Sequence, residues 1–481
     1  MSTGRPKVGV RSVSVALLLL LMSSPALAGG MEMPDNGTRA LARGGAFTVL
    51  ADDLSAIAHN PGALIRLQGT QLLFSNHVYL VDERFTRGPS LFPEDPNTQG
   101  YGHDPFAPVS NSETVFPLGP VFAVGSDFGE DNLFAAFGIY APNGTGKKKW
   151  PLDGGQRYML TELESLLFYV NGSLAYGEKD SYGVGLSLQV AMAPSMRMNM
   201  VTDGSPFGVL NPYASVNDVE AVLEVSDLFA LSAIFGAWWR PIPEIELGLS
   251  GRIVPVSLDA SGDFELRNIP GQTQFTPERL EVTGSSARLR LKLPPTLRAG
   301  VRYRHLCGGE ELWDVEVNVV YEAWSIMQSM DVEMEGQINL FAIAEAPNAN
   351  IARRWRDTLS TRIGSTFHLG ELATVSAGAY YETGAVPENY EHIDFMSFDR
   401  IGLSLGFGLE LGPVRLSGAY MHVFQEPRSV SEATAKGFQI RPLDPCPDAC
   451  DFGAGWSGVP ANTGVFESGY DIFSASIETT F

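Results

Sequence analysis

The chain has 481 residues, of which only 18% are charged, and its formal net charge is −22. This acidic balance argues against a nucleic-acid partner, since binding to phosphates depends on Lys and Arg. A soluble protein so poor in charged residues is unusual, whereas a membrane barrel must keep its lipid-facing surface uncharged. No linker or change of composition divides the chain, and after the first residues no apolar run reaches the roughly 18 residues of a membrane-spanning helix.

Residues 1–28 have the three regions of a secretory signal peptide. A basic stretch up to Arg11 precedes an apolar run over 13–22, and residues 26–28 supply a small-x-small cleavage pattern. Cleavage would remove three basic residues and no acidic one, which takes the net charge from −22 to −25. A buried N-terminal helix is the alternative interpretation.

Residues 29–68 do not alternate between apolar and polar side chains. The segment is rich in Gly and Ala, which permit close backbone packing, and Asn60-Pro61-Gly62 is a turn signal. The plain interpretation is a periplasmic tail.

Residues 69–481 alternate in segments of roughly 10 to 20 residues, as β-strands with two different faces do. In the clearest segment, every odd-numbered residue from Ile401 to Leu411 is apolar. Together with the segment around 312–322 and the weaker ones, the chain contains fourteen such alternating segments. The weaker segments start near 70, 115, 133, 165, 182, 227, 245, 285, 355, 374, 414 and 469.

Short turns, such as 129–132 and 412–413, join every second pair of these strands, and long polar segments join the others. Single-chain outer-membrane barrels have this layout and an even number of strands. A soluble β-sandwich would also alternate, but it needs a second sheet to bury its apolar face. We therefore predict an all-β fold, a transmembrane antiparallel β-barrel of 14 strands over 69–481.

The last strand alternates from Phe473 to Phe481. It resembles the terminal strand by which outer-membrane barrels are recognised for assembly. We therefore expect a monomer in the bacterial outer membrane, with membrane lipid and the barrel assembly machinery as partners.

Two consecutive strands carry opposite charges. The basic face carries Arg288, Arg290, Lys292, Arg298, Arg302 and Arg304, and the acidic face carries Asp314, Glu316, Asn318 and Glu322. We expect the two faces to form a ladder in the lumen, with Arg302 across from Asp314 and Arg298 across from Asn318. The alternative is that these side chains only line a solvated wall. If the ladder has a function, an arginine that is not needed for pairing holds a carboxylate ligand.

The connection at 199–226 contains a capping-box-like start at 215–218. Val219, Val222 and Leu223 follow at helical spacing. We predict an amphipathic helix whose apolar face either captures ligand at the outer surface or packs onto other loops.

Of the three cysteines, Cys446 and Cys450 are close enough in sequence for a disulfide in an oxidising exterior. Two further metal ligands are not in view beside them. No metal site and no cofactor are expected.

The stretch from Gly402 to Gly406 fits the G-x-S-x-G pattern of hydrolases, with Ser404 as its serine. A nucleophile elbow needs a strand-to-helix turn, whereas Ser404 lies in the middle of a predicted strand. We therefore do not expect an enzyme.

The non-alternating segment resembles the N-terminal hatch of the FadL/TodX family of outer-membrane transporters for long-chain fatty acids and other hydrophobic compounds. The resemblance rests on a Gly-x-x-x-Ala-like start, on Ala51-Asp52-Asp53 and on Asn60-Pro61-Gly62. Gly62 replaces the family's Ala, a small change that leaves the turn intact. Further similar blocks at 293–303, 321–325, 355–358 and 462–464 extend the resemblance over the mature chain.

The resemblance implies that residues 29–68 plug the lumen and that ligand binds against this hatch. The residues implied in binding are Phe47, Leu50, Asn60, Pro61 and Gly62.

The resemblance also implies a kink in the third strand that opens the wall sideways, at Gly138, Pro142 and Gly144. The alternative is an ordinary strand end, because proline cannot donate to a sheet ladder.

The leading function is therefore passive uptake of hydrophobic compounds, such as long-chain fatty acids or hydrocarbons. The alternative is a structural or adhesive barrel with acidic surface loops. A plugged lumen favours the first, since an adhesin does not need a plug.

Overall fold

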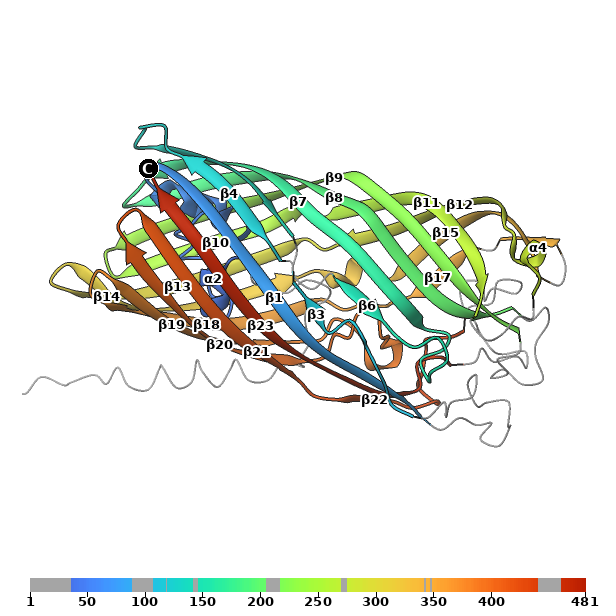
Figure 1. Cartoon of the computed structure of the whole chain (residues 1–481). Helices are drawn as coiled ribbons and strands as arrows, with labels where there is room; N and C mark the ends of the chain where they lie inside the picture. The colour runs from blue at the N-terminus through green and yellow to red at the C-terminus, as the bar shows by residue number, and fades with distance from the viewer. Residues whose placement is uncertain are drawn as a thin grey trace, which may run out of the picture.

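The computed structural model describes residues 36–88, 107–117, 119–141, 146–204, 217–269, 275–340, 343–346, 348–439 and 460–481. Its strands form a closed antiparallel barrel (Figure 1), in which β23 (Gly464–Thr480) pairs with β1 (Thr70–Arg87) to complete the ring. No helix in these ranges is both long and apolar enough to cross a membrane. The predicted 14-stranded antiparallel barrel is confirmed.

Ten positions in the wall are each occupied by one main strand. These are β1, β4 (Val121–Ser126), β5 (Leu133–Tyr140), β7 (Leu160–Glu178), β8 (Tyr182–Asp203), β9 (Asp218–Ile242), β19 (Ala373–Glu382), β20 (Arg400–Leu411), β21 (Val414–Gln425) and β23. Shorter strands extend the wall, namely β2 (Val109–Ser110), β3 (Val115–Phe116), β6 (Lys147–Lys149), β16 (Ile343–Glu345) and β22 (Arg428–Val430).

The other four positions are each formed by two strands in series. The pairs are β10 (Ile245–Val254) with β11 (Val256–Asn268), β12 (Thr283–Leu293) with β13 (Thr296–Cys307), β14 (Glu310–Glu322) with β15 (Ser329–Asn339), and β17 (Ala349–Ala352) with β18 (Thr358–Leu369). Pro255 separates the first pair and Pro294-Pro295 the second, since proline has no N–H for a ladder. The 3₁₀ turn η4 (Trp324–Ile326) interrupts the third.

The two ends of the barrel differ in their connections. Short turns such as 308–309 and 412–413 lie at the end that also holds the C-terminus, which we call the turn end. The long connections lie at the opposite end, which we call the loop end. Two short helices belong to these connections, α4 (Pro277–Leu280) and η5 (Glu388–Tyr390).

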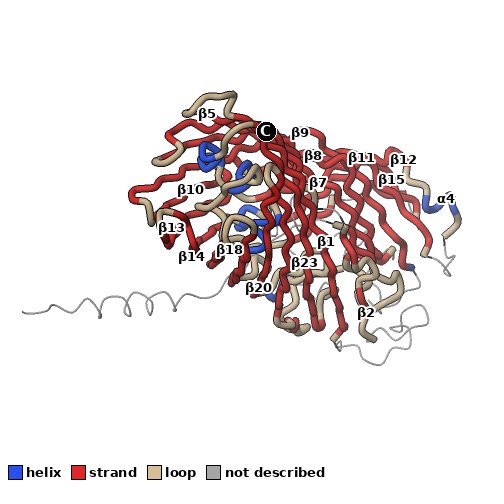
Figure 2. Tube along the Cα trace, turned by 60° about the vertical axis from the view of Figure 1, so that its left-hand side comes forward, coloured by secondary structure: helices blue, strands red, loops and turns tan. Residues whose placement is uncertain are grey.

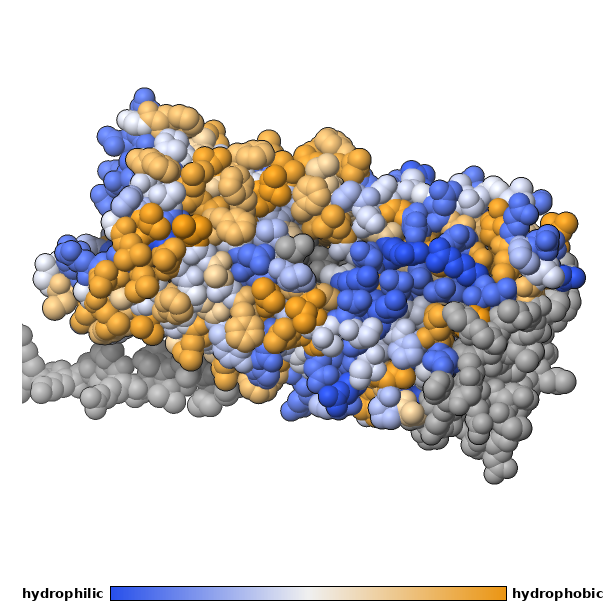
Figure 3. Space-filling model, viewed as in Figure 1, coloured by the Kyte–Doolittle hydropathy of each residue, from blue (hydrophilic) through white to orange (hydrophobic). Residues whose placement is uncertain are grey.

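The apolar face of the wall changes sides between the two ends. Near the turn end, apolar side chains such as Leu405 point outward and Ser404 points into the barrel. In β11, toward the loop end, Leu258 and Phe264 are buried inside while Asp259 points outward. Figure 3 shows this change on one face, with hydrophobic residues over the left-hand half and a hydrophilic patch over much of the right-hand half. The turn-end half is therefore suited to lipid, and the loop-end half encloses an apolar interior.

This change corrects part of the predicted charge ladder. Arg288, Arg290 and Lys292 lie on the outer face of β12, where Arg288 binds Asp259 at 2.5 Å. In β13, Arg302 points into the barrel. The alternation does not continue across Pro294-Pro295, so the basic residues before this break and those after it face opposite sides.

Residues 36–68 contain three short helices, α2 (Thr38–Ala42), α3 (Ala56–His59) and the 3₁₀ helix η1 (Pro61–Arg66). These helices lie within the ring of strands in the turn-end half (Figure 2). α2 packs mainly on β20 and β21, whereas η1 packs on β7, β8 and β9. The segment thus contacts the wall on more than one side.

The contact of η1 with β9 is close enough to require glycine. A Cβ at Gly62 would lie 2.7 Å from the carbonyl oxygen of Gly236 and 2.9 Å from the Cα of Ala237. The Asn60 side chain accepts a hydrogen bond from the Gly62 N–H at 3.1 Å, which holds the turn. The exchange of Ala for Gly is therefore not small, because a side chain there would meet strand backbone.

Gly62→Ala should therefore destabilise the barrel by about 1–3 kcal/mol, as expected of overpacking against backbone that cannot move aside. Gly172→Ala in β7 is the matched control, since a Cβ there would meet nothing within 4 Å. Urea unfolding in lipid vesicles measures both variants. Equal stability of G62A and G172A would show that η1 shifts without cost.

Candidate functional site

Arg43 joins the inner segment to the wall. Its guanidinium donates to both carboxylate oxygens of Asp314, at 2.9 and 2.7 Å, and to the Thr366 hydroxyl at 2.6 Å. The side chains of Arg43 and Asp314 are 1% and 0% exposed. A charge buried this deeply needs a partner with good geometry. The Arg43 guanidinium has one, because two of its N–H groups meet the two carboxylate oxygens of Asp314. Sequence analysis did not select Arg43, although an isolated charge among Gly and Ala is a signal for such a partner.

Glu316 makes the second contact between wall and segment. Its two carboxylate oxygens accept from the backbone N–H groups of Val49 and Leu50, at 2.8 and 3.0 Å. Hydrogen bonds to a charged acceptor are stronger than those between neutral groups. Two acidic residues of the predicted ladder, Asp314 and Glu316, therefore bind the inner segment directly.

The register of the ladder differs from the prediction by two residues. Arg302 lies across from Glu316, and Arg298 lies across from Val320. The turn is centred between Gly308 and Gly309 and not on Gly308, which accounts for one residue of this difference, and an irregularity between His305 and Leu306 accounts for the other.

The predicted contact of Arg302 with Asp314 nevertheless exists along the diagonal, at 2.6 Å. Arg302 also binds Glu311 and, at 2.7 Å, Glu246. Arg298 instead donates to the Ala58 carbonyl at 3.0 Å. Both arginines thus contribute to the contact region around the inner segment.

The other predicted hatch residues are buried. Phe47 packs edge-on against His59, with ring centroids 5.5 Å apart. The Asn60 amide donates to the carbonyls of Thr48 and Ala237, at 2.8 and 3.0 Å, which fixes the start of η1 to β9. Leu50 is 4% exposed.

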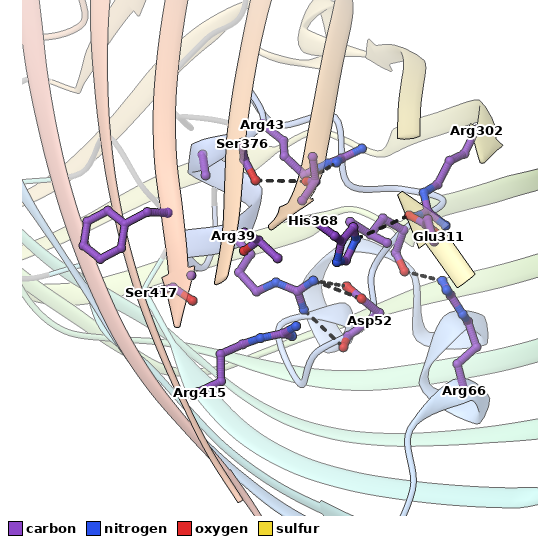
Figure 4. Close-up of a pocket in the computed structure, with 16 residues that line it drawn as sticks. Arg39, Arg43, Asp52, Arg66, Arg302, Glu311, His368, Ser376, Arg415 and Ser417 are labelled. Carbon is purple, nitrogen blue, oxygen red and sulfur yellow. Dashed lines mark hydrogen bonds and ion pairs between the residues drawn. The ribbon is translucent and has the colours of Figure 1, made fainter. Parts of the chain in front are cut away.

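A polar cavity of about 120 Å³ lies between the segment and the wall (Figure 4). Its lining residues with ionisable side chains are Arg39, Arg43, Asp52, Arg66, Arg302, Glu311, His368 and Arg415. In Figure 4, Arg39 points toward Asp52, and the two groups are 2.8 Å apart. Leu50, one of the residues predicted to bind ligand, lines this cavity beside the polar groups.

The wall changes its pairing beside α3. β4 and β5 are paired up to Val121 and Tyr140, and β6 is then paired with β7. A Cβ at Gly138 would lie 2.4 Å from Cδ1 of Ile57, so α3 touches β5 close to the end of that strand. The predicted residues Pro142 and Gly144 lie outside the described residues.

The predicted capture residues belong to a strand. Val219, Val222 and Leu223 lie in β9, so the predicted amphipathic helix is wrong. Val219, Leu223 and Val225 alternate with Glu220 and Glu224, which is a strand pattern. Val222 and Leu223 nevertheless line an apolar cavity of about 90 Å³ in the loop-end half.

Cys446 and Cys450 lie outside the described residues, so their predicted disulfide stays a prediction. Cys307 is a free, exposed cysteine at the turn between β13 and β14.

The connection between β19 and β20 contributes buried charges at the loop end. Arg353 binds Asp394 at 3.1 Å, and Glu391 binds Arg428 at 2.8 Å. Burial raises the pKa of Glu391 to about 8, although Arg428 acts in the opposite direction. The neutral form of Glu391 is therefore favoured in the folded protein.

Comparisons with known proteins agree with this geometry. Residues 19–441 match the family described as outer membrane protein transport protein (OMPP1/FadL/TodX). A search of curated protein sequences gave no match.

Solved structures of the same shape include a Pseudomonas aeruginosa FadL homologue, with a TM-score of 0.74 at 16% identity over 94% of this chain and 100% of the other. The toluene transporter TodX of Pseudomonas putida has a TM-score of 0.62 at 14% identity, over 94% and 99%. The toluene transporter TbuX of Ralstonia pickettii has a TM-score of 0.63 at 13% identity, over 93% and 99%. At these identities the likeness concerns the fold.

The closed barrel, its outward apolar belt and the family match together define an outer-membrane transport protein. The chain belongs to the OMPP1/FadL/TodX family, whose members carry hydrophobic compounds across the bacterial outer membrane. The predicted family, location and transport function are confirmed, and the protein is a transporter and not an enzyme.

The contact of Arg302 with Asp314 is testable by a double-mutant cycle with Arg302→Met and Asp314→Asn. Each single change removes one member of a buried ion network and should cost about 3–5 kcal/mol, although Asp314 keeps Arg43 and Arg302 keeps Glu246 and Glu311. The double change should cost less than the sum of the two single changes, because the contact between Arg302 and Asp314 is lost in both.

The exposed pair of Arg290 and Glu333, 2.6 Å apart, is the control and should show a coupling of roughly 0.2–1 kcal/mol. Unfolding in vesicles followed by tryptophan fluorescence gives the free energies. Additive losses at Arg302 and Asp314 would contradict the ladder.

Because of Glu391, we predict that the stability of the loop end depends on pH. Because its pKa is raised in the fold, its stabilising contribution is complete below the ordinary pKa near 4.5 and is lost as the pH rises through about 8. The protection factors of residues 383–399, which correct for the base-catalysed rise of intrinsic amide exchange, should therefore be lower at pH 9 than at pH 5, and Glu391→Gln should remove most of the difference. The same pH effect in E391Q would assign it to another group.

Proposed function

We propose that hydrophobic compounds enter the apolar interior of the loop-end half, and that residues 36–68 act as a hatch that closes the lumen beneath it. The reversal of the wall's apolar face supports this more than any other observation. An apolar compound gains about 25 cal/mol per Å² of surface removed from water, so an apolar interior above the membrane attracts it without an energy source.

The charged cavity beside the hatch supports the same division. An apolar molecule that passed straight down the lumen would meet the arginines and carboxylates around Asp52 and Arg302, which it cannot solvate. Passage through this region would place apolar surface against these ion pairs. A route that avoids the charged contact region therefore costs less.

A sideways exit beside β5 provides such a route. At the end of β4 and β5, the last backbone hydrogen bond runs from the Ala141 N–H to the Pro120 carbonyl at 3.2 Å. The next backbone hydrogen bond along this seam runs from the Ser112 N–H to the Lys149 carbonyl at 2.8 Å. The described residues between these points make no backbone bond across the seam. Since Ile57 of the hatch touches β5 at Gly138, a movement of α3 would reach the wall there.

A disulfide between hatch and wall tests the proposal. The hydroxyls of Thr38 and Ser474 are 2.6 Å apart, so Thr38→Cys with Ser474→Cys brings two thiols within bonding reach. Cys307, Cys446 and Cys450 are first replaced by Ser. The oxidised protein should lose most uptake of toluene and oleate into proteoliposomes, and a reductant should restore it.

The matched control is Thr70→Cys with Ser126→Cys, whose hydroxyls are 3.0 Å apart and which joins two wall strands, β1 and β4. This control should transport at the wild-type rate whether oxidised or reduced. Full uptake by the oxidised Thr38–Ser474 variant would rule out hatch movement as the gate.

A further inference from the structure

The barrel wall is interrupted at one level in four neighbouring positions. The interruptions are Pro255, Pro294-Pro295, residues 323–328 and residues 353–357. On the side nearer the turn end, an exposed apolar row runs across β13, β14 and β18, and it consists of Leu297, Tyr321 and Leu359. The interruptions therefore lie at the edge of the lipid-facing belt that is nearer the loop end.

Tyr321 marks this edge as the membrane surface. Its hydroxyl donates to Asp357 at 2.6 Å, and the other oxygen of Asp357 accepts from the Ser325 N–H at 2.9 Å. A tyrosine with its ring beside lipid and its hydroxyl bonded is typical of a membrane–water interface. Because long connections of such barrels face the cell exterior, the lipid headgroups at this edge belong to the outer leaflet.

Three cations without a counter-ion lie at this edge. Lys292, Arg354 and Arg356 are exposed, and each is next in sequence to a residue that is buried in the interior, so their side chains lie on the outer face. Within the described ranges, none of these three side chains takes part in a hydrogen bond or an ion pair. Farther from the lipid belt, by contrast, Arg290 binds Glu333 at 2.6 Å. The chain has a net charge of −22, so its composition does not explain such a cationic arc.

The three cations are within reach of one large headgroup. Lys292 lies near the end of β12, which pairs with β15, and β15 pairs in turn with β17. Two strand spacings, about 10 Å, therefore separate Lys292 from the end of β17. Arg354 and Arg356 follow shortly after this strand ends at Ala352.

The backbone at Arg354 has an unusual conformation. Its φ is 50°, in the left-handed region that residues other than glycine rarely adopt. The N–H groups of Arg353 and Arg354 both donate to the Gln328 carbonyl, at 2.9 and 3.0 Å, as in a β-bulge. Bulges redirect side chains, and backbone strain of this kind is concentrated at sites that bind ligands. An arginine where glycine would be relaxed therefore supports a role for its exposed guanidinium.

We propose that Lys292, Arg354 and Arg356 bind the phosphate-bearing headgroup of a lipid in the outer leaflet. A guanidinium can donate two parallel N–H bonds to one phosphate, and the Lys292 ammonium adds a compact charge. The acyl chains of this lipid lie against the exposed apolar row below. The site is on the outside of the barrel, so it does not depend on the proposed uptake of hydrophobic compounds.

Native mass spectrometry of the purified protein in detergent tests the site. The probe is diphosphoryl lipid A, and digalactosyldiacylglycerol is the comparison lipid without phosphate. Lys292→Gln combined with Arg354→Gln and Arg356→Gln should weaken the binding of diphosphoryl lipid A at least about tenfold. Digalactosyldiacylglycerol should bind the wild type and this variant alike. Heat-modifiable mobility on gels checks that each variant is folded.

The matched control removes three arginines of the outer face that already have carboxylate partners. It combines Arg84→Gln, Arg197→Gln and Arg267→Gln. The control changes the net charge by the same amount, and it should bind diphosphoryl lipid A within about twofold of the wild type because these cations are already paired.

Excess inorganic phosphate distinguishes a lipid site from a site for free anions, and it should not displace the bound lipid. Displacement by inorganic phosphate would overturn the assignment to a lipid. Equal binding of diphosphoryl lipid A by the wild type and the variant at 292, 354 and 356 would overturn the site. An equal loss in the control would assign the effect to net charge and contradict the proposal.

Discussion

The protein depends on a single wall that must be apolar on opposite faces at its two ends. In the turn-end half, lipid requires apolar side chains outside, so the inward positions are free for polar groups. In the loop-end half, ionic contacts such as Arg288 with Asp259 cover the outside, and the inward positions are apolar. Around β10 to β13 the change falls at the level of Pro255 and Pro294-Pro295, which interrupt the strands.

The polar interior of the turn-end half creates a second requirement. Charges such as Asp314 and Glu316 are fully buried, and buried charges are tolerated only when they are paired. The inner segment supplies part of the pairing, through Arg43 and the N–H groups of Val49 and Leu50. Removing the segment from the lumen would therefore expose uncompensated groups in the wall, so segment and barrel stabilise each other.

Period-two alternation was enough to predict the number of strands, because each strand has two different faces along its length. It could not predict the register of β13 with β14, since one irregular residue near His305 shifts every pair beyond it. It also failed at β12, where alternation was assumed to continue across Pro294-Pro295.

The contacts of residues 36–68 with the wall could not be predicted from local sequence patterns, for another reason. Arg43 and Asp314 are 271 positions apart, and nothing in either neighbourhood identifies the other. The apolar cavity of the loop-end half is likewise assembled from six strands, of which sequence analysis had interpreted one as a helix. Local patterns determine faces, but a site built across a barrel depends on which strands end up opposite one another.

The strength of these contacts limits how the lumen can open. Hydrogen bonds to charged groups contribute about 1.5–3 kcal/mol each, and Asp314 and Glu316 together accept several from the inner segment. Complete ejection of the segment would break all of these contacts at once, so it would be slow. α3 is joined to the wall through the carbonyls of Ile57 and Ala58, which accept from Ser187 and Arg298, and it touches β5 through Ile57. His59 binds the Asn36 carbonyl at 2.7 Å, which links α3 to the start of α2 at Thr38. A local movement of α3 together with Asn36 and Thr38, while Arg43 and Glu316 keep their contacts, is therefore the opening that the balance of contacts favours.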